Sequence, residues 1–98
     1  MNRFDQIRQW ASARNLIEGS DPKSQMLKLT EEVGELAGAI ARGKRAAAAD
    51  GIGDAVVVLT ILAAQLSLNV EDCINAAWAE IKDRKGRMEN GVFIKEGD

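Results

Sequence analysis

The chain has 98 residues, 46% hydrophobic and 29% charged, which is the balance of one small globular domain. Its formal net charge of -2 argues against a dedicated binder of nucleic acid or of anionic membranes. The absence of histidine excludes His-based acid–base catalysis and serine-type triads, and the single cysteine, Cys73, fits a reducing compartment. The charged N-terminus is unlike a secretory signal. We therefore expect a cytoplasmic protein whose single domain spans residues 1–98.

Hydrophobic periodicity predicts two helices in the N-terminal half of the chain. The first covers about residues 2–15. The second begins at Asp21, a favourable N-cap, followed by Pro22, which suits the first helical position. It ends near Gly43, since glycine commonly follows the last helical turn.

Two more helices are predicted in the C-terminal half, so the expected class is all-α. The third covers about residues 50–66, and the alanine-rich run 46–49 before it also favours helix. The fourth begins after the capping signal at Asn69 and ends in the basic run 82–87. Residues 91–95 add at most one short extended segment, because no part of the chain alternates well enough to form a sheet.

The third predicted helix is apolar on all sides between residues 55 and 64, so other helices must cover it completely. A single chain of this length buries only about 60–65% of the surface that its unfolded form exposes. We therefore expect an obligate homo-oligomer, a homodimer or homotetramer, with helices packed across subunits. The apolar run is too short to span a bilayer, so no membrane partner is expected. The fourth helix is expected to bury Val70, Cys73, Ile74, Ala77 and Ile81.

An acidic row lies in the second predicted helix. At 100° per residue, an arc of about 100° holds its charged side chains, namely Lys28, Glu31, Glu32 and Glu35. Like charges on adjacent turns repel, at a cost of roughly a few tenths of a kcal/mol per pair. The row is therefore either a solvated face or a site for a cation.

A second acidic pair, Asp50 and Asp54, shares one face of the third predicted helix, which continues as an apolar stripe over residues 57–61. A carboxylate at the head of such a stripe needs a cation or several hydrogen-bond donors. Alternatively, one of the two aspartates is the N-cap, and the helix begins only at Asp54, after the glycines of residues 51–53.

If the two acidic faces meet, four or five carboxylates converge without any histidine or cysteine. Oxygen-only ligand sets are typical of Mg²⁺, with Mn²⁺ the alternative, and such sites usually hold phosphate-bearing substrates. The cation would neutralise a polyphosphate and activate a water molecule. A carboxylate left over from coordination, such as Glu31, could then act as the base.

Other side chains suit a nucleotide. Trp10 could stack on a base, although a tryptophan at helical spacing is also typical of a core. Lys82, Arg84 and Lys85 could reach phosphates, or could simply interact with the end of their own helix. Lys28, beside the acidic row, is a further candidate for phosphate contact. The remaining aromatic side chains are assigned to the core or an interface: Phe4, Trp78 and Phe93.

The segments 31–36 (EEVGEL) and 50–59 (DGIGDAVVVL) resemble those of the MazG-like all-α nucleotide pyrophosphohydrolases. The similarity extends to residues 7–16, 80–87 and 90–93, so it covers nearly the whole chain. It is strongest to the small single-domain members found in bacteria and their phages.

This resemblance implies an oligomeric four-helix module that cuts nucleoside triphosphates between the α- and β-phosphates, giving monophosphate and pyrophosphate. It also implies that Glu32, Glu35 and Asp54 hold Mg²⁺ or Mn²⁺. The adjacent Glu31 would assist the metal site or act as the base, and Trp10 would contact the nucleobase.

One position departs from the family pattern. The family usually has glutamate three residues before the second-motif aspartate, and here that position is Gly51. The fourth carboxylate would then come from Asp50, because i, i+4 and i, i+3 neighbours share a helix face. Three alternatives to this enzyme stay open: a nucleotide-binding module without catalysis, which Gly51 favours, a helical dimerisation module with a solvated acidic face, and a phosphoribosyl-ATP pyrophosphohydrolase.

Overall fold

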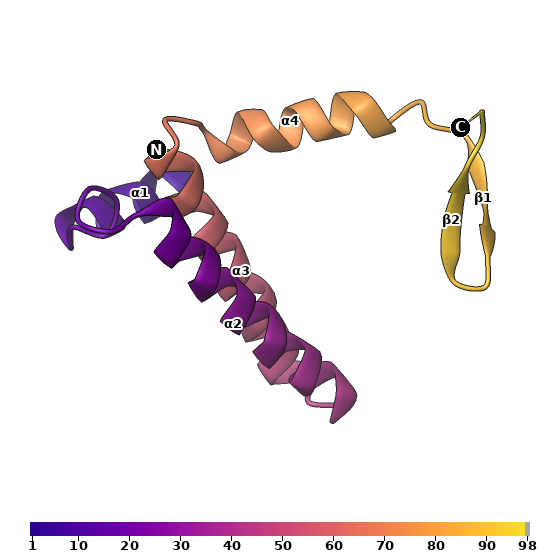
Figure 1. The fold of residues 1–98 in the computed structure, drawn as a ribbon, viewed down its shortest axis with the longest axis horizontal. Coiled ribbons are helices and arrows are strands. Elements are labelled where there is room, and N and C mark those ends of the chain that lie inside the picture. The colour runs from indigo at the N-terminus through magenta and orange to yellow at the C-terminus, as the bar shows by residue number, and fades with distance from the viewer. Residues whose placement is uncertain (98) are drawn as a thin grey trace.

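A computed structural model describes residues 1–97. It contains four helices and a hairpin, in the order α1 (Arg3–Ala13), α2 (Pro22–Ala41), α3 (Arg45–Gln65), α4 (Val70–Ile81), β1 (Gly86–Glu89) and β2 (Val92–Lys95). The prediction of four helices is confirmed. In Figure 1, α2 and α3 lie side by side, α1 crosses one end of this pair, and α4 leads away from it toward the hairpin.

The helix starts at Asp21 and Asn69 follow from local capping chemistry, as the sequence predicts. The backbone N–H of Ser24 donates to Asp21 Oδ1 at 2.8 Å, and that of Glu71 donates to Asn69 Oδ1 at 2.9 Å. At α1, the backbone N–H of Asp5 donates to Asn2 Oδ1 at 2.8 Å, and the N–H of Asn2 donates back to the Asp5 carboxylate at 3.3 Å. This reciprocal pair is a capping box.

The predicted start of α3 near residue 50 is wrong, whereas the predicted preference of residues 46–49 for helix is confirmed. The helix begins at Arg45 rather than at Asp50 or Asp54, and its N-cap, Lys44, makes no side-chain capping hydrogen bond. The high helix propensity of residues 46–49 extends the helix toward its N-terminus without a cap. Both aspartates therefore lie inside α3, and neither one caps it.

Gly51 lets α3 approach α2 closely. Gly51 is buried, and a Cβ atom added there would lie 3.1 Å from the Cβ of Leu36 on α2. At the other end of the pair, the Gln65 amide lies 3.3 Å from the backbone of Asp21 in one of its two orientations, and 3.3 Å from the carbonyl oxygen of Leu16 in the other. These two contacts fix an antiparallel register, with Leu36 level with Gly51.

The tail contains a sheet, which corrects the prediction of one extended segment. Strands β1 and β2 pair antiparallel, with Gly86 opposite Lys95 and Glu89 opposite Val92. Asn90 and Gly91 both have positive φ, of 50° and 79°, as the tight turn that joins β1 to β2 requires. Four-residue strands are too short to show alternation, so the local signal for this hairpin was the Asn-Gly turn.

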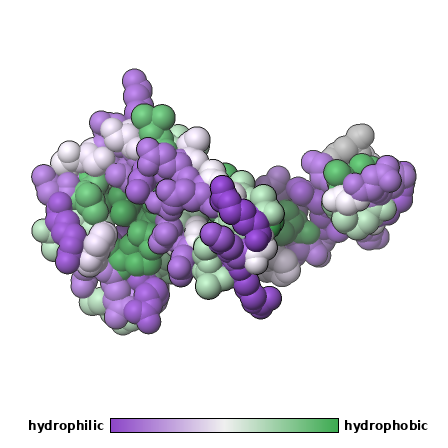
Figure 2. Space-filling model, turned by 90° about the horizontal axis from the view of Figure 1, so that it is seen from below, coloured by the Kyte–Doolittle hydropathy of each residue, from purple (hydrophilic) through white to green (hydrophobic). Residues whose placement is uncertain are grey.

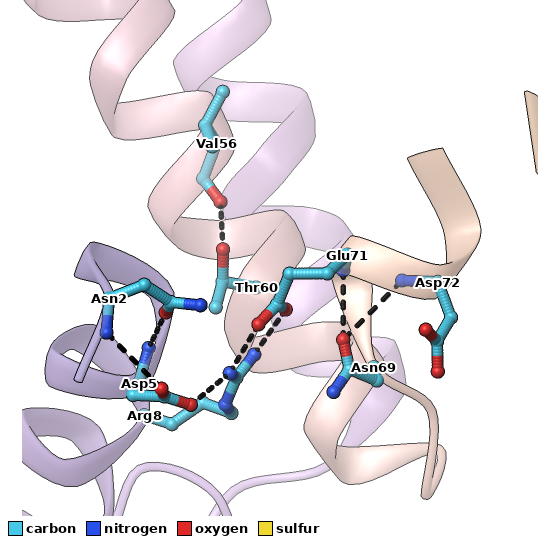
Figure 3. Close-up of polar contacts among 8 residues, drawn as sticks. All are labelled: Asn2, Asp5, Arg8, Val56, Thr60, Asn69, Glu71 and Asp72. Carbon is cyan, nitrogen blue, oxygen red and sulfur yellow. Dashed lines mark hydrogen bonds and ion pairs between the residues drawn. The ribbon is translucent and has the colours of Figure 1, made fainter. Parts of the chain in front are cut away.

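An ion-pair network joins α1 to the start of α4 (Figure 3). The guanidinium of Arg8 donates to both carboxylate oxygens of Glu71, at 2.7 and 2.6 Å, and to Asp5 at 2.6 Å. Hydrogen bonds from Arg8 lower the pKa of Glu71 to about 2. Beside this network, on α3, the buried hydroxyl of Thr60 donates to the carbonyl oxygen of Val56 at 2.7 Å.

The buried apolar core is small, consisting of Ala11, Ala39, Val58, Ile61 and Ala63. The expectation that α4 buries an apolar face is wrong for the single chain, because this helix has no fully buried residue and Ile74 is 63% exposed. Trp78 and Phe93 are exposed as well, so neither is part of the chain's core. In Figure 2, apolar side chains (green) reach the surface between polar ones.

The length of α3 also affects the membrane prediction. Among residues 1–97, α3 alone is long and apolar enough to cross a membrane by length and composition, because the helix extends well beyond the apolar run 55–64. A core helix of a soluble protein passes the same test. In the single chain only 28% of the apolar window is buried, and the helix also carries the exposed Asp50 and Asp54 and packs against α2.

Candidate active site

The acidic row of α2 is divided by burial. Glu32 faces α3, and its side chain is only 9% exposed, whereas Glu31 and Glu35 are exposed. The ammonium of Lys28 lies 3.2 Å from a carboxylate oxygen of Glu32. The hydrogen bond to Glu32 raises the pKa of Lys28, and the negative charges of Glu32, Glu31 and Glu35 add to this effect. The row is therefore a connected electrostatic unit.

The acidic pair of α3 lies at the level of this row. Asp50 and Asp54 are exposed and flank Gly51, which contacts Leu36, the residue directly after Glu35. With the antiparallel register and 100° per residue, Glu35, Asp50 and Asp54 fall on the same side of the α2/α3 pair. The sequence-predicted carboxylates thus belong to one region of the molecule.

Their side chains are not gathered around one point. Among residues 1–97, no group of three or more Asp, Glu, His or Cys side chains has an arrangement that could hold a metal ion. The donor chemistry nevertheless fits a hard divalent cation, since every candidate ligand is a carboxylate. Glu32 already holds a cation, the Lys28 ammonium. The metal site stays a prediction.

A small pocket adjoins this region. Its cavity of about 290 Å³ is lined by Arg3, Gln6, Ile7 and Trp10 of α1 and by Val57 of α3. Val57 follows Asp54 by three residues, one helical turn, so the pocket borders the acidic region. Trp10 is 47% exposed, so it is not a core residue.

Arg14 does not line this pocket but contacts its residue Trp10, a contact that the sequence reasoning missed. Its guanidinium carbon lies 4.4 Å from the centroid of the Trp10 ring, and its N–H donates to the carbonyl oxygen of Trp10 at 3.1 Å. The i, i+4 spacing of the two residues was the available signal. Arg14 covers one face of the indole ring.

The basic residues after α4 lie apart from the acidic region. Arg84 and Lys85 line an open depression of about 550 Å³ between the end of α4 and the hairpin, and Arg84 pairs with Glu80 at 3.7 Å. Lys82 is the C-cap of α4. Figure 1 shows this junction at the far end of α4 from the α2/α3 pair. Within one chain, the acidic residues are brought together with Lys28 but not with the other predicted phosphate-binding residues, Lys82, Arg84 and Lys85.

Comparison with known proteins identifies a relative and a family. The chain is 51% identical over 59 residues to an uncharacterized 18.2 kDa protein in the rep-hol intergenic region of Haemophilus phage HP1 (strain HP1c1). The aligned segment is 60% of this chain and 36% of the relative, so the chain spans about a third of that protein. No solved structure matches the chain.

Residues 20–88 match the MazG nucleotide pyrophosphohydrolase domain. The matched region contains α2, α3 and α4, and therefore both acidic rows, but not α1 with Trp10. Because the match takes in well over half of the sequence, the chain belongs to the MazG nucleotide pyrophosphohydrolase family.

Proposed function

We propose that this protein is a Mg²⁺-dependent pyrophosphohydrolase of ribo- or deoxynucleoside triphosphates, with Mn²⁺ as an alternative ion. It would cut between the α- and β-phosphates and serve nucleotide-pool housekeeping. The observation that carries the proposal is the placement of the two acidic rows at one level of the α2/α3 pair, around the contact between Gly51 and Leu36. Membership of the MazG family supports the reaction class.

The residues divide into ligands and a base. Glu32, Glu35, Asp50 and Asp54 would hold the ion, which supplies charge neutralisation for the triphosphate and lowers the pKa of water. Glu31 is exposed beside them and would accept the proton of the attacking water. Water supplies the new P–O bond, and pyrophosphate leaves with the electron pair of the cleaved bond.

Gly51 explains why Asp50 is proposed as the fourth ligand. A side chain at position 51 would press against Leu36, since its first carbon would already lie 3.1 Å from the Leu36 Cβ. Asp50 is exposed and adjacent, so it can carry a carboxylate without disturbing this helix contact. The departure from the family pattern therefore coincides with a close contact between α3 and α2.

The pocket beside Trp10 would take the nucleobase. The indole of Trp10 is half-exposed and has Arg14 over one face, so its other face would stack on the base. The substrate would then extend from this pocket past Asp54 to the acidic rows, where Lys28 contacts its phosphates.

The protein would act as a homodimer or homotetramer. Its accessible surface of 7351 Å² exceeds, by roughly 1,900 Å², the value of about 5,500 Å² for a compact chain of this mass. A dimer that covers this surplus on both chains buries roughly 3,800 Å², as obligate homodimers do. An apolar groove of about 340 Å³ between α3 and α4, lined by Leu59, Leu62, Leu66 and Ile74 among others, is the proposed contact. Lys82, Arg84 and Lys85 would then serve the partner subunit's site.

The test is a panel of ribo- and deoxynucleoside triphosphates, incubated with and without Mg²⁺ and resolved by chromatography. Monophosphate and pyrophosphate that form only with the metal are the expected products, and their rates rank the substrates. Diphosphate and orthophosphate would contradict the assigned bond. Binding of nucleotide without any product would favour the second candidate, a non-catalytic binding module, which the missing carboxylate at Gly51 supports.

A further inference from the structure

Glu32 is a carboxylate that the fold nearly removes from solvent. Its side chain is 9% exposed, because it lies on the face of α2 that packs against α3. An ionised carboxylate in such a place needs a cation or hydrogen-bond donors close to it. The cation that the structure gives it is the ammonium of Lys28, at 3.2 Å.

Lys28 is placed so that it can leave without disturbing the core. Its side chain is 54% exposed, and its ammonium sits on a flexible four-carbon stem one turn before Glu32. A lysine N-terminal to its glutamate is also the less favourable orientation of an i, i+4 pair. The carboxylate of the pair is therefore held by the helix packing, while the ammonium that neutralises it reaches in from a half-exposed side chain.

We propose that Lys28 is a tethered stand-in cation, which neutralises Glu32 in the metal-free protein and gives up this carboxylate when a divalent cation binds. The inference rests on the proposed function, which makes Glu32 a metal ligand. A released ammonium remains beside Glu31 and Glu35, where it meets the phosphates that accompany the metal. One lysine thus has two successive anionic partners.

The first test measures binding of Mn²⁺ alone by isothermal titration to the wild type and to K28M, which removes the charge and keeps most of the stem. K28M should bind Mn²⁺ several-fold more tightly, because the cation no longer competes for Glu32. The matched control is K23M on the same helix, because among residues 1–97 no ion pair joins Lys23 to an acidic side chain. The K23M variant should bind Mn²⁺ with the affinity of the wild type. Unchanged or weaker binding by K28M would overturn the proposal.

The second test follows release of the pair directly. Mg²⁺ titration of protein carrying ¹³C-labelled lysine should shift the side-chain signals of Lys28 in the wild type and leave those of Lys23 in place. In E32Q, the Lys28 signals should already lie near the released position. If the wild-type signals stay unchanged at saturating Mg²⁺, the pair persists in the metal-bound protein and the proposal is wrong.

These outcomes separate the inference from the proposed function. Wild-type protein without saturable Mn²⁺ binding would overturn the metal site and the exchange together. Saturable Mn²⁺ binding with release of Lys28 from Glu32, but without hydrolysis of any triphosphate, would support the replacement of Lys28 by the metal ion. The same result would contradict the proposed enzymatic activity.

Discussion

At the scale of single residues, the proposed metal site depends most on three carboxylates. Glu32 is buried against α3, while Glu35 and Asp54 stand exposed on the same side of the α2/α3 pair. Their residue types and spacing were predictable from the sequence, because helical periodicity alone places them on common faces. Arg14, which covers the Trp10 ring, was not recognised, because a cation–π pair resembles any other i, i+4 neighbour in sequence.

Replacement of each of these carboxylates by its amide should lower turnover by about 100-fold or more, since each replacement removes one negative ligand of the cation. The substitutions E32Q, E35Q and D54N keep side-chain size, so helical content measured by circular dichroism should stay that of the wild type. Full activity in all three variants would contradict the assignment.

The pocket makes a second prediction at this scale. W10A should raise the KM for a nucleoside triphosphate more than it lowers kcat, because stacking of a base on an aromatic ring contributes about 1–3 kcal/mol. W10F keeps a stacking surface and should retain most of the affinity. Steady-state kinetics of the two variants measure this difference, and equal KM values for W10A and the wild type would exclude Trp10 from base binding.

At the scale of elements, the starts of the capped helices α2 and α4 could be predicted from the sequence. The start of α3, which has no side-chain cap, could not. Asp21 and Asn69 mark the starts of α2 and α4 in the sequence, because their side chains accept hydrogen bonds from the first turn of the helix. The start of α3 at Arg45 has no such signal and depends on the propensity of the alanines that follow. The Asn90-Gly91 turn was also a local signal. The hairpin was missed because its four-residue strands are too short to show alternation.

The two glycines inside α3 test the close contact between the helices. Gly53 has nothing within 4 Å of an added Cβ, so G53A should stabilise the protein by about 0.5–1 kcal/mol through helix propensity. G51A gains the same propensity but presses on Leu36, so it should be less stable than G53A by about 1 kcal/mol or more. Urea unfolding measures both, and equal stabilities would contradict the tight packing at Gly51.

The ion pair between Arg8 of α1 and Glu71 of α4 predicts that the free energy of unfolding depends on pH. Arg8 lowers the pKa of Glu71 from the ordinary value of 4.5 to about 2. Because the folded-state pKa is the lower one, this pair stabilises the fold fully above pH 4.5, and the stabilisation is lost as the pH falls toward about 2. The difference in unfolding free energy between the wild type and E71Q should therefore shrink between pH 6 and pH 3. A difference that does not change with pH would contradict the pair.

At the scale of the whole molecule, the chain is more extended than its length requires. Its radius of gyration is 16.2 Å, against about 13 Å for a compact domain of this size. The apolar face of α4 was recognisable from the sequence, but periodicity shows which face is apolar and not what covers it. Likewise, the pairing of Arg8 with Glu71, 63 residues away, leaves no local trace in the sequence.

The proposed subunit contact between α3 and α4 predicts how substitutions in the groove change the oligomeric state. I74E places a charge in the apolar groove between α3 and α4, so it should convert the oligomer to a monomer, whereas I74L should leave it intact. Sedimentation equilibrium measures both. A wild-type protein that is monomeric at micromolar concentration would contradict the contact.

The proposed reaction is metal-dependent cleavage of a nucleoside triphosphate between its α- and β-phosphates. The most direct measurement is a ³¹P NMR time course on one sample of protein and triphosphate, first with a chelator and then with excess Mg²⁺. With the chelator we expect an unchanged triphosphate spectrum. After Mg²⁺ is added, we expect signals of the monophosphate and pyrophosphate in equal amounts. Cleavage in the presence of the chelator, signals of diphosphate and orthophosphate, or an unchanged triphosphate after Mg²⁺ would contradict the proposed reaction.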